Sequence, residues 1–259
     1  MLKKIEGLQL QKVTSAPIGF SEEEVYIIDK GYNGNDVVIK TSSRQEVFYE
    51  GKNLAWLFEK TYVPKVYQMG EIENHKYVMM EKLPGRMLHE AFLYLPIEEV
   101  ITLYAKAIRA FHTIPIENIP YNYDTAEKIK EAAIRVRENR VKVKYFEREF
   151  QGMSASEVYQ LMLRYKQKEV DIVLCHGDVS MPNMIIDENK KIGYIDVSQI
   201  GTCDRYMDIA IGLRSLRYNL EAINRKLTPD YLQIFKKAYG IERIDKKKLL
   251  FYILLDELH

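Results

Sequence analysis

The segment VLCHGDVSMPNMIIDENKKIGYIDVSQ, residues 173–199, sets three oxygen-bearing side chains between short apolar runs. Asp178 follows the first run, Asn183 directly precedes the second, and Asp196 ends the third. Apolar runs on both sides of the polar sequence 187–190 predict two strands joined by a turn. Such a hairpin would begin at Asn183 and end at Asp196, so we expect these two side chains to lie side by side.

This spacing has a chemical interpretation. A carboxylate and an amide oxygen held together suit Mg²⁺, which prefers oxygen ligands and substrate phosphates. Asp178, just upstream on the same loop, is placed to accept a proton from an attacking hydroxyl group. The simpler interpretation is that His176, Gly177 and Asp178 form only a polar turn. Three correctly spaced oxygen donors favour the first interpretation, with Asp178 as the catalytic base and Asn183 and Asp196 as metal ligands.

The segment resembles the catalytic core of the aminoglycoside phosphotransferases, a family related to the eukaryotic protein kinases. Residues 201–217 and 251–259 are also similar to the 3'-phosphotransferase branch of that family. The resemblance covers most of the chain and is weakest between about residues 85 and 170. It implies an antibiotic resistance kinase, which transfers the γ-phosphate of a nucleotide to a hydroxyl group of an aminoglycoside. The implied cofactors are Mg²⁺ and ATP or GTP.

The composition limits the partners and the compartment. The chain has 259 residues, enough for one large or two modest domains. Its 38 basic and 37 acidic residues nearly cancel, so no nucleic-acid or membrane partner is expected. The chain has only two cysteines, Cys175 and Cys203, no secretory pattern after Met1, and no apolar run of about 20 residues. These features predict a cytoplasmic protein, and we expect a monomer or a weak dimer.

The residues before Leu83 have the pattern of a small β-rich lobe. Short β-branched and aromatic runs predict strands at 25–28, 37–39, 65–69 and 77–80, with a turn marked by Lys30-Gly31 and Asn33-Gly34. One helix interrupts them. Ser43 and Glu46 predict a capping box at its start, and Val47, Leu54, Leu57 and Phe58 follow at helical spacing.

The residues after Gly85 are mostly helical in pattern. Periodic apolar residues predict six helices, near 96–113, 125–140, 155–168, 206–220, 229–239 and 246–257. Together with the resemblance, this change of pattern predicts an α+β, bilobal, protein-kinase-like fold. Its expected parts are an N-terminal nucleotide-binding lobe at 1–82, a hinge at 83–86 and a larger catalytic lobe at 87–259.

Lys40 and Glu50 are predicted to form an ion pair in the small lobe. Lys40 ends an apolar strand, and Glu50 falls on the apolar stripe of the predicted helix. A carboxylate there is unfavourable without a partner, and Lys40 is the obvious one. Such a pair holds an ammonium group against nucleotide phosphates. The alternative is a solvated strand end beside a carboxylate at the edge of the stripe.

Further nucleotide contacts follow from the resemblance alone. The sequence contains neither GxxxxGK[ST] nor GxGxxG, which argues against P-loop and Rossmann sites. The resemblance implies that Ser21 contacts the β-phosphate and that the hinge backbone from Glu81 to Leu83 binds adenine. It also places Val38 on the face of the base, where relatives often have an aromatic residue.

Two polar residues within apolar helical runs are expected to be structural. The resemblance implies that Asp208 accepts hydrogen bonds from the backbone of the catalytic loop. His112 is interpreted as a packed histidine and not as a catalytic one.

The acceptor site is predicted at the C-terminus. Asp256, Glu257 and the terminal carboxylate of His259 would form an anionic patch for ammonium groups, and Arg214 is a further candidate substrate residue. The chain departs from the family pattern at 181–182, where a relative can carry acidic or hydroxyl residues, and at 218–219, where acidic residues are frequent. Residues 128–148 contain eight Lys or Arg against three Glu, which we interpret as a solvated helix face.

Three functions therefore remain open from the sequence. The first is an aminoglycoside phosphotransferase, and the second is a kinase of the same fold acting on another hydroxylated compound, such as an amino alcohol, a sugar or another antibiotic. The third is a non-catalytic nucleotide-binding relative, which the presence of the whole predicted catalytic set disfavours.

Overall fold

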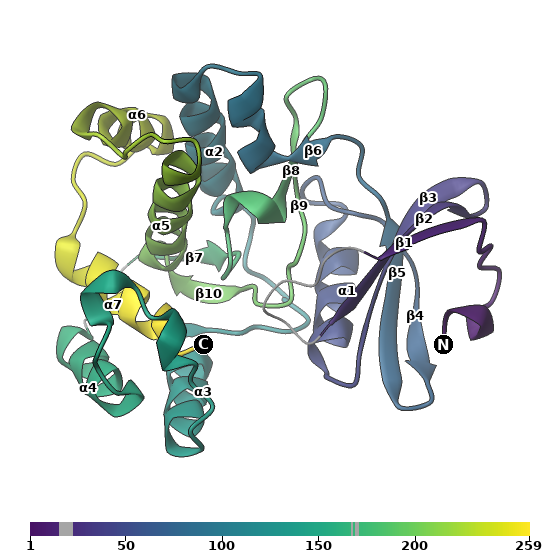
Figure 1. The fold of residues 1–259 in the computed structure, drawn as a ribbon, viewed down its shortest axis with the longest axis horizontal. Coiled ribbons are helices and arrows are strands. Elements are labelled where there is room, and N and C mark those ends of the chain that lie inside the picture. Colours follow the sequence, from purple (N-terminus) through teal and green to yellow (C-terminus); the bar gives the residue numbers. More distant parts are fainter. Residues whose placement is uncertain (16–22, 167, 169–170) are drawn as a thin grey trace. The chain divides into compact units, whose positions relative to one another are not determined.

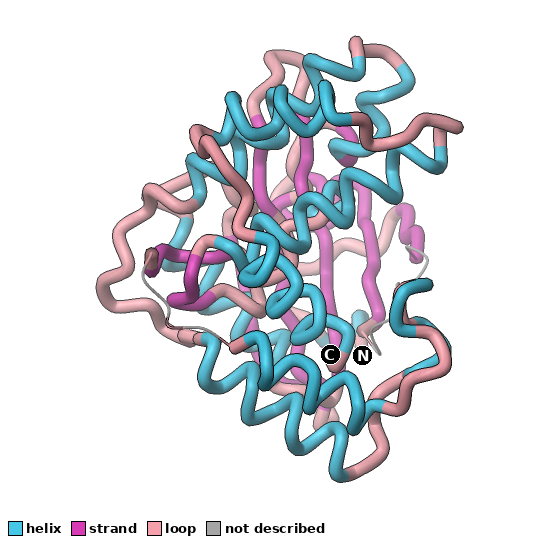
Figure 2. Tube along the Cα trace, turned by 90° about the vertical axis from the view of Figure 1, so that its left-hand side faces the viewer, coloured by secondary structure: helices cyan, strands magenta, loops and turns pink. Residues whose placement is uncertain are grey.

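A computed structural model describes residues 1–15, 23–166, 168 and 171–259 and shows an α+β protein (Figures 1 and 2). The chain divides into two compact units. The first contains Met1–Arg86, Asn118–Tyr121 and Met184–Gln199, and the second contains Met87–Glu117, Asn122–Asn183 and Ile200–His259. The first unit is therefore built from three separate stretches of the chain.

An antiparallel five-stranded sheet forms most of the first unit, in the order β1-β2-β3-β5-β4. Its strands are β1 (Lys12–Ser15), β2 (Glu24–Tyr32), β3 (Asn35–Ser42), β4 (Val66–Ile72) and β5 (His75–Glu81). Asn33 and Gly34 have φ values of 49° and 78°, which suit the tight turn of a two-residue hairpin. Lys30-Gly31 is not part of that turn. It lies within β2, where the register with β3 shifts between Ile28 and Tyr32 as in a β-bulge.

Helix α1 (Glu46–Leu57) packs against β3, β4 and β5 (Figure 1). Val47, Leu54 and Leu57 are fully buried, as their helical spacing predicts, but Phe58 follows the last residue of the helix and is 46% exposed. The predicted capping box is wrong, because the helix begins one residue after Gln45, which makes no side-chain cap. The Oγ of Ser42, not of Ser43, accepts a hydrogen bond from the Arg44 amide in the bend before the helix.

The hairpin predicted between Asn183 and Asp196 is confirmed, with its strands at 184–186 and 192–194 in the first unit. Strands β8 (Met184–Ile186) and β9 (Ile192–Tyr194) pair antiparallel, with Met184 opposite Tyr194. Asp187 Oδ1 accepts hydrogen bonds from the amides of Asn189 and Lys191 and so closes the turn. A short strand, β6 (Arg86–Met87), lies at the other edge of β8.

The second unit is mostly helical, and all six predicted helices are present. They are α2 (Ile97–Phe111), α3 (Thr125–Arg137), α4 (Ala155–Tyr165), α5 (Tyr206–Ala222), α6 (Pro229–Tyr239) and α7 (Lys246–Glu257). Helix α7 packs against both α4 and α5 (Figure 1), and α2 packs against α6. Short 3-10 turns occur at Leu2–Lys4 in the first unit and at Leu88–Leu93, Val143–Tyr145, Arg148–Phe150 and Met181–Asn183 in the second.

Two antiparallel strands, β7 (Ile172–Cys175) and β10 (Gly201–Asp204), lie among these helices. The chain leaves β7 directly into the segment that carries the predicted catalytic base. No helix in the described residues is long and apolar enough to cross a membrane.

Candidate active site

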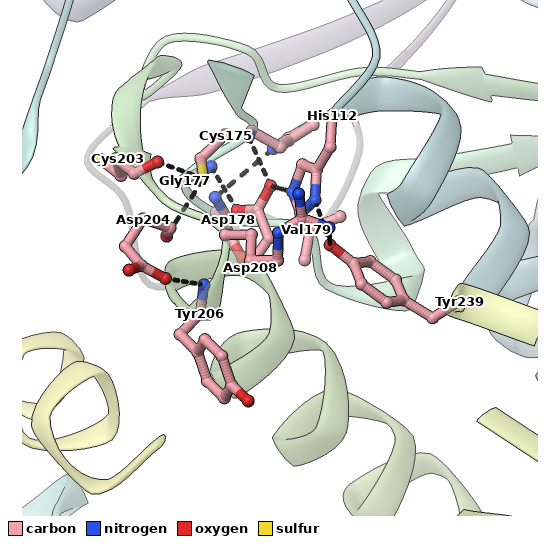
Figure 3. Close-up of polar contacts among 12 residues, drawn as sticks. His112, Cys175, Gly177, Asp178, Val179, Cys203, Asp204, Tyr206, Asp208 and Tyr239 are labelled. Carbon is pink, nitrogen blue, oxygen red and sulfur yellow. Dashed lines mark hydrogen bonds and ion pairs between the residues drawn. The ribbon is translucent and has the colours of Figure 1, made fainter. Parts of the chain in front are cut away.

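Asp208 anchors the loop that follows β7. This fully buried carboxylate accepts hydrogen bonds from the amides of His176, at 2.7 Å, and Gly177, at 2.9 Å (Figure 3). Burial acts to raise the pKa of Asp208, but the hydrogen bond and charge of His112 and the bond from Gly177 outweigh it, so the pKa is lowered. Asp208 therefore stays ionised and fixes the loop backbone, which is the structural role expected for it.

His112 supports Asp208 through a hydrogen bond within the core. Its Nε2 lies 2.9 Å from Asp208 Oδ2 and its Nδ1 lies 2.7 Å from the Tyr239 hydroxyl (Figure 3). Because a carboxylate only accepts hydrogen bonds, Nε2 carries a hydrogen. The ring is almost fully buried, which agrees with its interpretation as a packed histidine.

The grouping of His112, Cys175 and Asp208 is a hydrogen-bonded network. Their ligand-type atoms lie within 4.8 Å of one another, a spacing that a metal ion would also require. Each of these atoms already has a hydrogen-bond partner, since the Cys175 thiol donates to the carbonyls of Cys203 and Asp204 and Asp208 binds the loop amides. Interactions within the protein therefore account for this cluster.

Asn183 and Asp178 are coupled directly. The Asn183 Nδ2 donates to Asp178 Oδ2 at 2.8 Å and to the Asp178 carbonyl at 3.1 Å. These bonds hold the Asp178 carboxylate in one orientation. They also use the nitrogen end of the Asn183 amide, so its oxygen end is the part that can ligate a hard cation.

Two residues that the sequence did not single out hold the rest of this loop. The Tyr104 hydroxyl donates to the Val179 carbonyl at 2.7 Å, and Ser215 Oγ accepts from the Met181 amide at 2.9 Å. Tyr104 lies on α2 and Ser215 on α5, far from the loop in sequence. Periodicity identifies both only as buried helical positions, so their loop contacts had no sequence signal.

Three further predicted site residues, Lys40, Glu50 and Asp196, lie together in the first unit. Lys40 Nζ lies 2.9 Å from both Glu50 carboxylate oxygens and 3.1 Å from Asp196 Oδ1. Burial acts to lower the pKa of Lys40, but the charges of Asp196 and Glu50 raise it. Burial raises the pKa of Glu50 to about 7, although the charge of Lys40 acts to lower it. The predicted pair is thus present as a buried contact, and it includes Asp196 as a third member.

The Asp196 backbone is held in an uncommon conformation. Its φ is 59°, in the left-handed region, and its amide donates to Glu50 Oε1 at 3.1 Å. The side chain remains 38% exposed, which leaves room for a ligand. Asp196 belongs to the first unit and Asn183 to the second, so their sharing of a metal ion stays a prediction.

The predicted adenine contacts lie on the inner strands β3 and β5 and directly after β5. Val38 and Lys40 share a face of β3, because side chains two apart on a strand point the same way, whereas Val37 and Ile39 are buried in the core. Glu81 pairs with Val37 at the end of β5, and the buried Leu83 follows. Ser21 lies outside the described residues.

The predicted substrate residues separate into two groups. Arg214 forms ion pairs with Asp256 and, at 2.9 Å, with Glu257. Glu147, which the sequence reading missed, joins this cluster by donating its amide to Glu257 Oε2 at 2.9 Å and by pairing with Arg217. Burial raises the pKa of Glu257. The carboxylates of the expected anionic patch are therefore partnered by arginines.

His259 makes a different set of contacts. Its ring lies 3.1 Å from the Lys128 carbonyl. Arg135 donates to the Leu258 carbonyl, at 2.9 Å, and to the terminal carboxylate of His259. Burial, followed by the charges of Lys128 and Arg135, lowers the pKa of His259 to about 3. Lys128 is itself buried and lies over the Tyr123 ring, so not every residue of the basic segment is on a solvated face.

Known proteins provide an independent comparison. The sequence profile of a phosphotransferase enzyme family matches residues 12–251. The chain belongs to this family. Over 256 residues, this phosphotransferase is 31% identical to an aminoglycoside 3'-phosphotransferase from Niallia circulans, and the match covers 98% of the chain and 95% of that relative.

Solved structures agree with this assignment. An aminoglycoside 3'-phosphotransferase of type VIII matches with a TM-score of 0.85 and 26% identity, covering 99% of this chain and 96% of that one. An aminoglycoside phosphotransferase from Streptomyces rimosus, solved with ADP and streptomycin, matches in fold with a TM-score of 0.77 and 22% identity, covering 94% and 92%. The predicted fold class and phosphotransferase family are confirmed.

Proposed function

We propose that this phosphotransferase moves the γ-phosphate of a nucleotide to a hydroxyl group of an aminoglycoside. The observation that carries the proposal is the hydrogen bond from Asn183 to Asp178. It orients the Asp178 carboxylate and leaves the amide oxygen of Asn183 to ligate a cation. The loop that holds both is anchored through Asp208. This arrangement suits proton removal from a hydroxyl acceptor beside a metal-bound phosphate.

Asp178 is the proposed base. Phosphoryl transfer has a loose transition state, so the protein contributes mainly position and charge neutralisation. Asp178 would orient the acceptor hydroxyl and take its proton late in the reaction. Asn183 and Asp196 offer the oxygen ligands that Mg²⁺ prefers, and Mg²⁺, when bound, would neutralise charge on the nucleotide phosphates.

The nucleotide contacts come from the first unit in this proposal. Lys40, held by Glu50, would place its ammonium group against the phosphates, and Ser21 would contact the β-phosphate. Adenine would bind the backbone between Glu81 and Leu83, with Val38 on its face. ATP is the proposed phosphoryl donor, and GTP is the alternative. The proposed compartment is the cytoplasm, and the proposed oligomeric state is a monomer or a weak dimer.

The acceptor is proposed from the charges near the C-terminus. This cluster has three carboxylates, from Glu147, Asp256 and Glu257. They form ion pairs with two guanidinium groups, those of Arg214 and Arg217. The remaining negative charge supports an acceptor with ammonium groups. The second candidate function is phosphorylation of a hydroxylated compound with fewer amines. The two arginines favour it, because carboxylates that already pair with arginines attract additional ammonium groups less strongly.

A nucleotide-consumption assay tests this proposal and separates the candidates. The purified protein is incubated with ATP or GTP, with and without Mg²⁺, and with a panel of aminoglycosides, amino alcohols and sugars. Metal-dependent turnover with an aminoglycoside is the expected result, and phosphate on the drug is checked by mass spectrometry. Turnover with only the other compounds supports the second candidate, and nucleotide binding without turnover of any compound rejects both.

A further inference from the structure

Helix α1 carries a second buried polar side chain one turn after Glu50. Asn53 is fully buried, and its Nδ2 donates a hydrogen bond to the Val197 carbonyl at 3.0 Å. Residues three apart on a helix lie on the same face, so Glu50 and Asn53 point in the same direction. All of these residues belong to the first unit.

The two side chains hold the backbone on both sides of Asp196. Glu50 Oε1 accepts a hydrogen bond from the Asp196 amide, and Asn53 binds the carbonyl of the next residue, Val197. The backbone between these anchors includes the left-handed φ of Asp196. That conformation is unfavourable for residues other than glycine and persists where the surrounding structure enforces it.

We propose that Asn53 is a positioning residue that sets the direction of the Asp196 carboxylate by fixing the Val197 carbonyl. The inference rests on the proposed function, in which Asp196 is a metal ligand. Lys40 and Glu50 hold the carboxylate and the amide of Asp196, respectively. Asn53 supplies the anchor on the C-terminal side, which neither of those residues contacts in the described hydrogen bonds.

Packing alone does not account for an asparagine at this position. Asn53 Oδ1 is buried and has no hydrogen-bond partner among the described residues. An unsatisfied buried oxygen is unfavourable, whereas an apolar side chain of similar size would fill the space without that cost. The favourable contribution of the amide is therefore its hydrogen bond to Val197.

Asn53→Leu removes this bond and keeps a side chain of similar volume. The probe is Mn²⁺ binding, measured by electron paramagnetic resonance in the presence of a non-hydrolysable ATP analogue. We expect Mn²⁺ to bind about 10–100-fold more weakly, as when other supports of metal ligands are removed. Binding of the analogue in EDTA should be unchanged, and any fall in Tm should be small, because loss of the bond to the Val197 carbonyl is offset by removal of the unsatisfied Asn53 Oδ1. Lys52→Leu, on the exposed side of α1, is the matched control and should bind Mn²⁺ normally.

Asp196→Ala separates this inference from the proposed function. If Asp196→Ala binds Mn²⁺ as the parent does, Asp196 is not a metal ligand and the proposed metal site fails. If Asp196→Ala is weakened but Asn53→Leu is not, the proposed site stands and the positioning role of Asn53 is overturned. A fall in Tm with unchanged Mn²⁺ binding also overturns it.

A double substitution provides a second test. Adding Asn53→Leu to Asp196→Ala should not weaken Mn²⁺ binding further, because Asn53 acts through Asp196. Additive losses would show that Asn53 affects the site by another route and would overturn the inference. Asn53→Gln, which keeps the amide donor, should restore part of the affinity lost in Asn53→Leu.

Discussion

At the scale of single residues, the site depends on carboxylates whose partners are fixed. Asp208 is held by amides, Asp178 by an amide side chain and Glu50 by an ammonium group. Each of these partners limits both the charge and the direction of the carboxylate. Substitutions that preserve shape but remove charge are therefore the most informative changes.

Asp178→Asn should lower kcat for the best acceptor by about 10²–10⁴-fold, the usual contribution of a general base. Nucleotide affinity should be unchanged, because the proposed contact of Asp178 is with the acceptor. Steady-state kinetics and calorimetric titration of the nucleotide measure the two quantities. Asp230→Asn, at an exposed position in the first turn of α6, is the control. Near-normal turnover in Asp178→Asn would remove Asp178 from the catalytic role.

Lys40 and Glu50 should behave as one functional unit. Lys40→Ala and Glu50→Ala should each lower kcat/KM, and the double variant should lose little more than Lys40→Ala alone. The reason is that Glu50 acts on nucleotide binding mainly by orienting the Lys40 ammonium group. Independent losses that multiply in the double variant would contradict this coupling.

At the scale of elements, the connection from β5 into β6 requires a glycine. Gly85 has a φ of 116°, and a Cβ there would lie 2.1 Å from the Ile186 carbonyl oxygen in β8. The close approach joins the predicted hinge segment to the 184–194 hairpin within the first unit. A side chain at position 85 would be strained by the positive φ and would clash with the Ile186 backbone.

Gly85→Ala should therefore lower the free energy of unfolding by about 2 kcal/mol or more, because it combines strain with a backbone clash. Gly34→Ala is the matched comparison. Gly34 also has a positive φ, 78°, but no atom lies within 4 Å of its added Cβ. Its loss should be about 1 kcal/mol, from strain alone. Urea unfolding measures both, and equal losses would mean that the contact with Ile186 has no energetic effect.

The C-terminal helix predicts a pH dependence of stability. The pKa of His259 falls to about 3 on folding from an ordinary 6.5. The folded state thus keeps His259 neutral, and this contribution to stability is full above pH 6.5 and is lost as the pH falls toward 3. At pH 5 the loss should be about 2 kcal/mol.

His259→Phe should remove this loss, since it keeps an aromatic ring beside Tyr123 but cannot bind a proton. The measurement is the difference in free energy of unfolding between pH 7.5 and pH 5 for the parent and the variant. His75→Phe, at an exposed ring, is the control. The same pH dependence in parent and His259→Phe would show that His259 protonates as easily in the folded protein as in the unfolded one.

At the scale of the whole molecule, basic and acidic residues nearly cancel in number, but several carboxylates gather near the C-terminus. The formal net charge is only +1, so long-range attraction of a polycation is weak, and the proposed acceptor binding would depend on the carboxylates near the C-terminus. Asp256→Asn with Glu257→Gln should raise KM for an aminoglycoside by at least tenfold, since charge-assisted hydrogen bonds contribute about 1.5–3 kcal/mol each. Nucleotide KM should stay constant. An unchanged drug KM would move the acceptor site elsewhere.

The sequence predicted most of the elements because their signals are local. Helical periodicity and the Asn33-Gly34 turn depend on neighbouring residues, and the structure follows them. The 173–199 segment predicts Asp178, Asn183 and Asp196 as site residues from their spacing between apolar runs, and their roles stay a prediction. Contacts between residues far apart in the sequence had no such local signal. The hydrogen bond between Glu147 and Glu257 joins residues 110 positions apart, and the one between Asn53 and Val197 joins residues 144 positions apart. Ser43 was a false capping signal because the chain bends before the helix begins.

The discontinuous first unit has a consequence for synthesis on the ribosome. Met1–Arg86 emerges first, but Asp196, Val197 and strands β8 and β9 follow only with Met184–Gln199. At ordinary translation speeds this delay is on the order of ten seconds. During that time the nascent chain holds Lys40, Glu50 and Asn53 without their later partners. The first unit is therefore completed only by a segment made after most of the second unit, and residues 1–86 expressed alone should not form a complete unit.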